Sequence, residues 1–209
     1  MSRRKINRLN NIPLMYEVEN FMSPEEIAHF LSLGDDGMSR AQVSDIKKGR
    51  ESKSRTNRVR WIAHDHTPVL QAIADRASAL VGIPLTNAEK FQLIHYNQSQ
   101  EYRAHYDAFD PNIPRGKRNW VRGGQRLVTL LVYLNHVEAG GHTDFPNLEL
   151  SVAPTPGKAV IFHNCYPNTN RRHPLTLHAG APVVVGQKWA FNLWFRESDR
   201  SKKIQPPVH

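Results

Sequence analysis

Two short segments of the sequence place a histidine two positions before an aspartate, and both could supply ligands to a metal ion. His105 and Asp107 lie in EYRAHYDAFD, and His142 and Asp144 lie in GGHTDFP. Because side chains two apart point to the same side of a strand, either pair could present an imidazole nitrogen and a carboxylate oxygen to one ion. A further histidine would complete a two-histidine, one-carboxylate set, which suits Fe(II) and leaves coordination positions open. The spacing alone is weak evidence, because a chain with 11 histidines contains such pairs by chance, and either pair could simply be a polar strand end.

Three other histidines could supply the third ligand. His163 ends an apolar segment, where a hydrogen-bonded core histidine is the usual interpretation. His173 lies in the polar segment NTNRRHP, where we expect it to be solvated. His178 is followed by alanine and glycine, whose small side chains leave space around a metal. The one cysteine, Cys165, excludes an internal disulfide and a cysteine-rich zinc site, so any metal must be held by His, Asp or Glu.

The second half of the chain contains the strands that would position these residues. From residue 90 onward, short segments rich in β-branched and aromatic residues alternate with Gly, Pro and Asn clusters, which is typical of strands and turns. These segments are FQLIHYN, EYRAHYD, RLVTLLVYLN, LELSVAP, KAVIFHN, APVVVG and QKWAFNLWF. Close-spaced strands after helices predict an α+β chain with a double-stranded β-helix (jelly-roll) core and N-terminal helices packed on its outside. Residues 111–124 are expected to be a long loop, of a kind that often forms a lid or binding segment.

The first half of the chain is predicted to contain a strand, two helices and a basic loop. Residues 15–21 read as a strand, and the S-P-E-E sequence at 23–26 forms a capping box for a helix that ends near Gly34. A second helix covers residues 67–82. Between the helices, residues 41–62 are expected to form a strand followed by a long basic loop.

Length and composition indicate one globular domain. The chain has 209 residues, 39% apolar and 22% charged, and no apolar run approaches the roughly 20 residues that span a bilayer. The N-terminal segment is basic and lacks an apolar signal region, so we predict a cytoplasmic protein. We expect one domain over 1–209, with flexible tails at about 1–12 and 198–209, a supporting region at 13–90 and the core at 91–197.

The net charge of +9 is unevenly distributed. Residues 47–60 carry seven basic residues against one acid, Glu51; the seven are Lys47, Lys48, Arg50, Lys53, Arg55, Arg58 and Arg60. Such a segment could serve solubility, or it could attract an acidic peptide or a nucleic acid.

The order of the motifs that follow His105 resembles the prolyl 4-hydroxylase family of Fe(II)/2-oxoglutarate dioxygenases. The successive segments are GGQRLVTLLVYLN, GGHTDFPNLELSVAPTPGKAVIFHN and LTLHAGAPVVVGQKWAFNLWFRE. The resemblance is closest over residues 91–197 and looser over residues 16–60. It implies an enzyme that uses Fe(II), 2-oxoglutarate and O₂, with ascorbate as the expected reductant.

The resemblance implies roles for particular residues. His105 and Asp107 match the first two iron ligands, and His178 matches the third. Lys188, in GQKW, matches the basic residue that binds the distal carboxylate of 2-oxoglutarate. An unpaired lysine would be costly in a segment as apolar as QKWAFNLWF, and a charge-assisted bond to a carboxylate would offset that cost. His142 stands where the family usually has glutamate, so we interpret it and its neighbouring aspartate as a pair that does not bind iron, and this departure leaves open an altered pocket wall.

Other contacts are implied in the same way. Tyr96 and Thr129 match a tyrosine and a threonine that contact the cosubstrate, although either could be a satisfied polar group of the core. Tyr102 matches the aromatic residue of the family's Y-x-P-H motif, with alanine in place of the proline, and is expected to line the pocket. Arg55 and Trp194 are expected on the substrate side.

The resemblance implies hydroxylation of a prolyl residue in a peptide or protein. In the family, two loops border the substrate groove, here about 45–62 and 108–124; because both are basic, we expect acidic residues beside the target. The same iron chemistry on a free amino acid or small metabolite is the first alternative. A nucleic-acid-directed oxygenase or binding protein is the second, and an inactive jelly-roll interaction module the third. Against nucleic acid, the basic stretches lack interleaved aromatic residues apart from Trp61 and Trp120. We expect no membrane partner, and the oligomeric state is left open.

Overall fold

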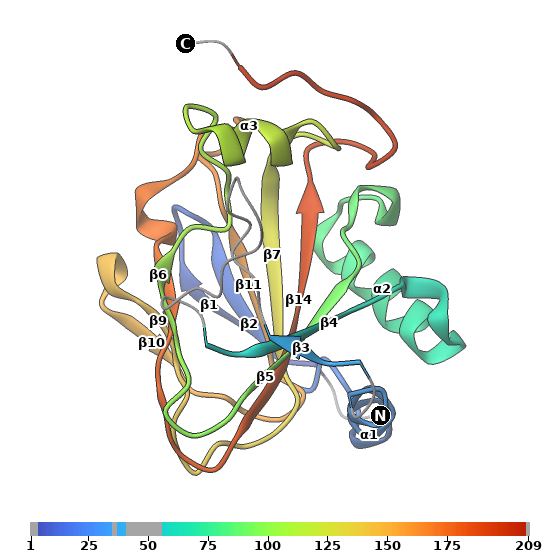
Figure 1. The fold of residues 1–209 in the computed structure, drawn as a ribbon, viewed down its shortest axis with the longest axis vertical. Helices are drawn as coiled ribbons and strands as arrows, with labels where there is room; N and C mark the ends of the chain where they lie inside the picture. The colour runs from blue at the N-terminus through green and yellow to red at the C-terminus, as the bar shows by residue number, and fades with distance from the viewer. Residues whose placement is uncertain (1–3, 35–36, 41–55, 208–209) are drawn as a thin grey trace.

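Most strands of the chain lie in two β-sheets that face each other (Figure 1). The computed structural model describes residues 4–34, 37–40 and 56–207. The larger sheet has eight strands in the order β1 (Ile6–Asn10), β2 (Met15–Val18), β11 (Ala159–His163), β7 (Arg126–Tyr133), β14 (Lys188–Arg196), β5 (Phe91–Tyr96), β4 (Arg58–Ile62) and β3 (Ser39–Arg40). The smaller sheet has the order β10 (Leu150–Val152), β9 (Thr143–Phe145), β12 (His178–Gly180) and β6 (Tyr102–His105), and β8 (Ala139–Gly140) pairs with β13 (Val183–Val185). Antiparallel strands in this non-sequential order form a jelly roll.

Alternate residues of β14 belong to two different hydrophobic cores. Ala190 packs between the two sheets, with residues such as Phe145 of β9 and Phe162 of β11. Phe191 packs on the opposite face, where the ring of Phe30 stacks on it with centroids 4.5 Å apart. The period of two along a strand produces this division. The even-numbered residues of β14, from 188 to 194, therefore lie on the face that points toward the smaller sheet.

Two helices cover the outer face of the larger sheet, and each begins at the capping residue predicted from the sequence (Figure 1). Helix α1 (Pro24–Ser32) starts after Ser23, whose hydroxyl accepts from the Glu26 amide at 3.2 Å while the Glu26 carboxylate accepts from the Ser23 amide at 2.9 Å. Helix α2 (Pro68–Val81) starts after Thr67 and ends at Gly82, which has a φ of +70°. Among the residues described, no helix is both long and apolar enough to cross a bilayer.

The segment 111–124, predicted to be a loop, contains a third helix, α3 (Pro114–Trp120). Proline at the first helical position favours this start, and the buried Trp120 fixes the other end. Gly116 lets the helix approach the preceding turn, because a Cβ there would lie 1.7 Å from the carbonyl oxygen of Asp110. The loop prediction was wrong because the Gly and Pro that suggested irregular structure serve helix initiation and close packing.

The end of the segment 41–62, where a basic loop was expected, contains a strand. Residues 58–62 form β4, which pairs with β5 and buries Val59 and Ile62. Residues 41–55 lie outside the described part of the chain, and with them Arg55 and most of the basic run from 47 to 60.

Both expected tails contain paired backbone. Ile6–Asn10 forms β1, an edge strand paired with β2. Near the other end, the Ile204 amide donates to the Val121 carbonyl at 2.9 Å, and Lys203 forms an isolated bridge with Arg122. The sequence hides these contacts because main-chain hydrogen bonds, which join polar segments as readily as apolar ones, contribute to both.

Candidate metal centre

Three side chains converge at one end of the smaller sheet. His105, Asp107 and His178 each offer one ligand atom, and the three atoms lie within 4.8 Å of one another. His105 ends β6 and His178 begins β12, and the two face each other in the antiparallel pairing. Asp107 lies two residues beyond the end of β6, with its Oδ1 3.8 Å from Nε2 of His105 and its Oδ2 3.6 Å from Nε2 of His178.

Backbone carbonyls fix the orientation of both imidazoles. Nδ1 of His105 lies 2.9 Å from the carbonyl oxygen of Arg103, and Nδ1 of His178 lies 2.9 Å from that of Thr176. A ring whose Nδ1 donates to a carbonyl presents its Nε2 lone pair outward, which is the tautomer that a metal requires. The ring of Tyr102 stacks on that of His105, with centroids 3.5 Å apart and a 19° angle. The imidazoles are therefore oriented before any metal binds.

Asp107 is held by a chain of buried hydrogen bonds. The Thr129 hydroxyl donates to Oδ2 of Asp107 at 2.8 Å and accepts from the side-chain amide of Asn164 at 2.9 Å. Burial opposes ionisation of Asp107, but the neighbouring charges of His178, His105 and Arg126 outweigh it and lower its pKa to about 2. The carboxylate is therefore charged and fixed in direction. Asn164 was not singled out from the sequence, although it lies two residues after Phe162, on the same side of the chain.

Removing the Thr129 hydroxyl should weaken metal binding. We expect Thr129→Val to raise the Kd for Mn(II), used in place of Fe(II), by about tenfold, because loss of a hydrogen bond to a ligating carboxylate typically costs about 10–100-fold in metal affinity. Thr129→Ser keeps the hydroxyl and should bind Mn(II) like the wild type. Calorimetric titration of the three proteins measures the effect, and equal affinity for the valine and serine variants would contradict it.

A second buried polar group lies between the sheets. Lys188 begins β14 opposite Tyr96, and it is 3% exposed. Its ammonium donates to the Gly141 carbonyl at 2.6 Å and lies 5.6 Å and 5.4 Å from the ring centroids of Tyr96 and Tyr133. Among the described residues, no carboxylate lies within ion-pair distance of it. Burial lowers the pKa of Lys188 to about 7, against a smaller opposite effect of Asp144. Within the described part of the chain, Lys188 is thus a desolvated cation without an anionic partner.

Tyr133 lines the same space and was missed as a site residue. Its hydroxyl donates to Oγ1 of Thr143 at 2.8 Å, and burial raises its pKa, which keeps the phenol neutral. A signal was present in the sequence, because Tyr133 lies four residues after Thr129 on one strand and so shares its face.

A buried ion cluster adjoins Asp107 and also was not predicted. Arg126 makes a bidentate pair with Glu89, at 2.7 Å and 2.9 Å, and its guanidinium lies 3.7 Å from the ring centroid of Trp194. Another nitrogen of Arg126 is 4.0 Å from Oδ1 of Asp107, and Arg196 donates to Glu89 at 3.1 Å. Burial raises the pKa of Glu89, but the arginines outweigh it and hold that pKa below its usual value.

A pocket of about 750 Å³ opens beside this cluster. His105, Asp107, Tyr102 and Trp194 all line it, so the structure brings two of the predicted metal ligands together with two of the residues expected on the substrate side. Thr129 lies behind Asp107 and Tyr96 beside Lys188. Their predicted cosubstrate contacts stay predictions.

The other aspartates and histidines of the sequence analysis lie elsewhere. His142 and Asp144 are not part of the metal-binding cluster found among the described residues, and Asp144 accepts from the Ser151 hydroxyl at 2.6 Å. His173 was predicted to be solvated, but it is 5% exposed and accepts from the Leu175 amide at 3.2 Å. The prediction was wrong because His173 caps a turn, and its ring is covered there.

Comparison with known proteins identifies the family. The model of the 2OG-Fe(II) oxygenase superfamily matches residues 91–196, half of the chain. A putative prolyl 4-hydroxylase of Acanthamoeba polyphaga mimivirus is 33% identical over 182 residues, which cover 87% of this chain and 74% of that protein. The chain belongs to the prolyl 4-hydroxylase family of 2OG-Fe(II) oxygenases. The family predicted from the order of the motifs is confirmed, and the protein is a 2-oxoglutarate-dependent dioxygenase.

Other proteins similar to this oxygenase are also prolyl hydroxylases. Prolyl 4-hydroxylase 5 of Arabidopsis thaliana is 35% identical over an alignment of 197 residues, which covers 84% of this chain and 66% of that protein. A crystal structure of the viral collagen prolyl hydroxylase of Paramecium bursaria Chlorella virus-1, in complex with 2-oxoglutarate, is 30% identical. It superposes with a TM-score of 0.68 and covers 87% of this chain and 95% of that one.

The residues of this oxygenase fit the groups that its family uses. Two oriented imidazoles and one ionised carboxylate form a donor set that suits Fe(II) and leaves coordination positions for other ligands. The buried ammonium of Lys188 has the charge that a carboxylate of 2-oxoglutarate requires.

Proposed function

We propose that this oxygenase hydroxylates a prolyl residue of a peptide or protein, with His105, Asp107 and His178 holding the iron and Lys188 binding the distal carboxylate of 2-oxoglutarate. The observation that carries the proposal is the convergence of the three ligand atoms at the edge of a pocket of about 750 Å³. The ligand triad and Lys188 lie within the residues that the oxygenase family matches.

The protein's part in this reaction is to orient and to desolvate. Bound Fe(II) supplies the activation of O₂ that couples decarboxylation of 2-oxoglutarate to hydroxylation of a C–H bond. Thr129 and Asn164 hold Asp107 in one orientation, and main-chain carbonyls do the same for the two histidines. Burial of Lys188 strengthens its attraction for an anion, because few waters compete.

The substrate pocket favours a peptide over a free amino acid. Its volume lies in the upper part of the roughly 300–1,000 Å³ range of ligand sites, and a single amino acid would fill a small share of it. The pocket is lined by residues of β4, β6, α3 and β14, so its wall extends well beyond the metal ligands. A chain of several residues could contact all of these elements at once.

The proposal is tested by measuring succinate formed from 2-oxoglutarate with Fe(II) and ascorbate, alone and with proline-containing peptides. Peptide-stimulated succinate and a peptide mass increase of one oxygen, both lost in His105→Ala, would support it. Succinate formation that no peptide stimulates, but that His105→Ala still abolishes, would reject the peptide substrate and favour the small-molecule alternative. No succinate from the wild-type protein would reject the activity itself.

Several expectations from the sequence stay predictions. They are ascorbate as reductant, the cytoplasmic location, and the roles of Arg55, Tyr102 and Trp194 on the substrate side. Arg55 lies outside the described residues.

A further inference from the structure

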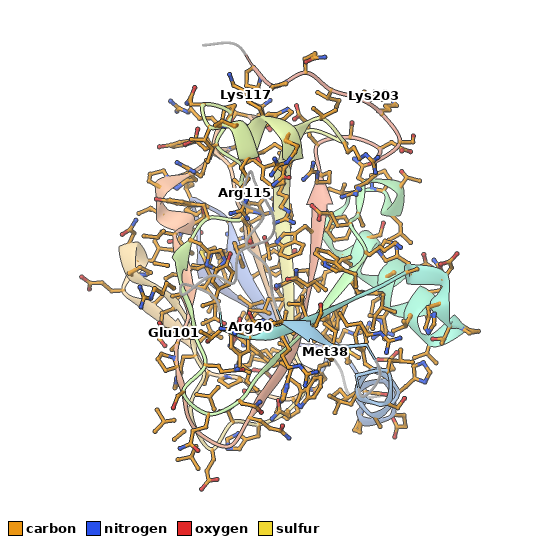
Figure 2. The ribbon with its side chains drawn as sticks, viewed as in Figure 1. Met38, Arg40, Glu101, Arg115, Lys117 and Lys203 are labelled. Atoms are coloured by element: carbon orange, nitrogen blue, oxygen red, sulfur yellow. The ribbon has the colours of Figure 1, made fainter. Side chains whose placement is uncertain are left out.

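Helix α3 presents a row of arginines to the pocket. Arg115, Arg118 and Arg122 follow one another at spacings of three and four, which places them on one side of the helix and its extension, and all three line the pocket. Lys117 belongs to the same helix but does not line the pocket. Figure 2 shows Arg115 on the side of α3 that faces the sheets and Lys117 on the opposite side.

The carboxylates of the pocket do not neutralise this row. Of the acids that line it, Glu89 is bound by Arg126 and Arg196, Asp107 belongs to the metal cluster, and Asp110 lies 3.6 Å from Arg172. Within the part of the chain that the structure describes, Arg115, Arg118 and Arg122 make no ion pair with a carboxylate. Among the described residues, eight arginines line the pocket against these three acids; they are Arg40, Arg115, Arg118, Arg122, Arg126, Arg172, Arg196 and Arg200. The pocket therefore attracts anions.

The same pocket offers little to a nucleobase. A base stacks on an open aromatic face. Of the described aromatic residues that line the pocket, only Trp61 is exposed, at 47%, and the others are covered by guanidinium or imidazole groups. Guanidinium groups lie over Trp194, at 3.7 Å, and over Tyr106, at 4.3 Å, and the imidazole of His105 covers Tyr102. Phe109 lies under the guanidinium groups of two arginines. This arrangement favours carboxylates over the stacked bases of a single strand.

The row is held on a rigid support. The guanidinium of Arg196 donates to the carbonyls of Asn119 and Arg122, at 2.5 Å and 2.6 Å, and is anchored in turn on Glu89. Gln125, directly before β7, accepts a hydrogen bond from the Phe109 amide and donates one to the Phe109 carbonyl. Asp107 lies only two residues before Phe109. These bonds therefore fix the backbone that carries the arginine row relative to Asp107.

We infer that the arginine row on α3 selects peptides with acidic residues beside the target proline. The inference rests on the proposed function and adds the chemistry of the flanking residues. Arg115, Arg118 and Arg122 bind side-chain carboxylates of the substrate through charge-assisted hydrogen bonds, while the proline lies near the metal centre. Because Arg118 and Arg122 are exposed, their attraction is weakened by salt.

The test compares three peptides of equal length around one proline, flanked by glutamate, serine or lysine. We expect the KM of the glutamate peptide to be about three- to tenfold below that of the serine peptide, and the lysine peptide to be the poorest, because a few exposed ion pairs contribute effects of this size. The preference should shrink in about 0.3 M NaCl.

Two double variants with the same change in charge separate the row from general electrostatics. In Arg115→Glu/Arg118→Glu the KM of the serine peptide divided by that of the glutamate peptide should fall to one or below. In Lys117→Glu/Lys90→Glu, at two exposed positions that do not line the pocket, this ratio should keep its wild-type value. Thermal unfolding by circular dichroism confirms that each variant is folded, and Arg115→Gln/Arg118→Gln replaces the first variant if it is not. Equal KM values in the wild type, or an equal loss of preference in both variants, would overturn the inference.

A binding measurement keeps the inference testable if the proposed function fails. If the wild-type protein hydroxylates none of the peptides, fluorescence anisotropy of the labelled glutamate peptide is measured instead. Binding that depends on Arg115 and Arg118 would support the arginine row as a binding surface for acidic peptides, even if the hydroxylation activity were absent. Tighter binding of a single-stranded oligonucleotide of equal length, lost in the same variant, would overturn it in favour of a nucleic acid.

Discussion

His105→Ala should reduce 2-oxoglutarate consumption to background and weaken Mn(II) binding by more than about 100-fold. The loss should exceed the ~10–100-fold typical of groups that only support a ligand, because here a donor atom itself disappears. His105 also carries the stacking contact with Tyr102 and faces His178 across the strand pair. Among the described residues, the cluster that could hold the metal consists of His105, Asp107 and His178, so the variant loses one of its three ligand atoms. Succinate formation and calorimetric titration with Mn(II) measure the two effects.

His142→Ala is the matched control for this variant. It removes the same side chain from the other His-x-Asp segment, whose residues lie outside the metal cluster. Metal affinity should stay at the wild-type value. If His142→Ala lost Mn(II) binding and His105→Ala kept it, the assignment of the two segments would be reversed.

The part of the site that could be predicted consists of residues whose spacing within one strand determines the direction of their side chains. The alternation of QKWAFNLWF places Lys188, Ala190 and Trp194 on one face of β14, and the structure has them on the face toward the smaller sheet. His105 and Asp107 converge as their spacing indicated, even though β6 ends at His105. Periodicity fixes which way a side chain points, and that is a local property.

The part that could not be predicted depends on contacts between strands far apart in the sequence. Thr129 meets Asp107 across 22 positions and Asn164 across 35, and Arg126 meets Glu89 across 37. Nothing in the local pattern of RLVTLLVY specifies which of its polar residues will face a carboxylate. Thr129 meets Asn164 because β7 pairs with β11, and it meets Asp107 because the larger sheet packs against the end of β6 in the smaller sheet. A single sequence encodes neither arrangement as a local signal.

Helix α3 was missed for a different reason. Its sequence, PRGKRNW, contains one proline and one glycine, which are typical of loops. The structure uses the proline to begin the helix and the glycine to approach Asp110, so both residues have positional meanings that composition alone hides. The sequence shows the basic charge of this segment. It does not show that the arginines share one side, because that depends on the segment being a helix.

Lys188→Met should abolish 2-oxoglutarate binding and at the same time stabilise the ligand-free protein. Lys188 is buried, has the Gly141 carbonyl as its hydrogen-bond acceptor, and lies beside no carboxylate in the described structure. A buried ammonium without an anionic partner is unfavourable, and methionine fills a similar volume without charge. Calorimetric titration with 2-oxoglutarate and Mn(II) measures the loss of binding. Lys90→Met, at an exposed position, is the control: it should change neither the affinity for 2-oxoglutarate nor the stability of the ligand-free protein.

The dependence on pH distinguishes this explanation from a packing effect. The pKa of Lys188 in the folded protein, about 7, lies below its unfolded value of roughly 10.4, so between these pH values the unfolded chain binds more protons. The destabilisation by Lys188 is therefore full below about pH 7 and fades as the pH rises toward 10. The melting temperature of Lys188→Met should exceed that of the wild type most at about pH 6 to 7, where the buried ammonium of the wild type is still charged. The difference should narrow at higher pH.

A carboxylate bound to the ammonium of Lys188 raises the pKa of that group, so 2-oxoglutarate binding to the wild type takes up a proton above pH 7. Its affinity should be constant below about pH 7 and weaken by up to about tenfold per unit above it. An affinity that strengthens with pH over this range, or a methionine variant less stable than the wild type at every pH, would show that Lys188 serves the fold and not the cosubstrate.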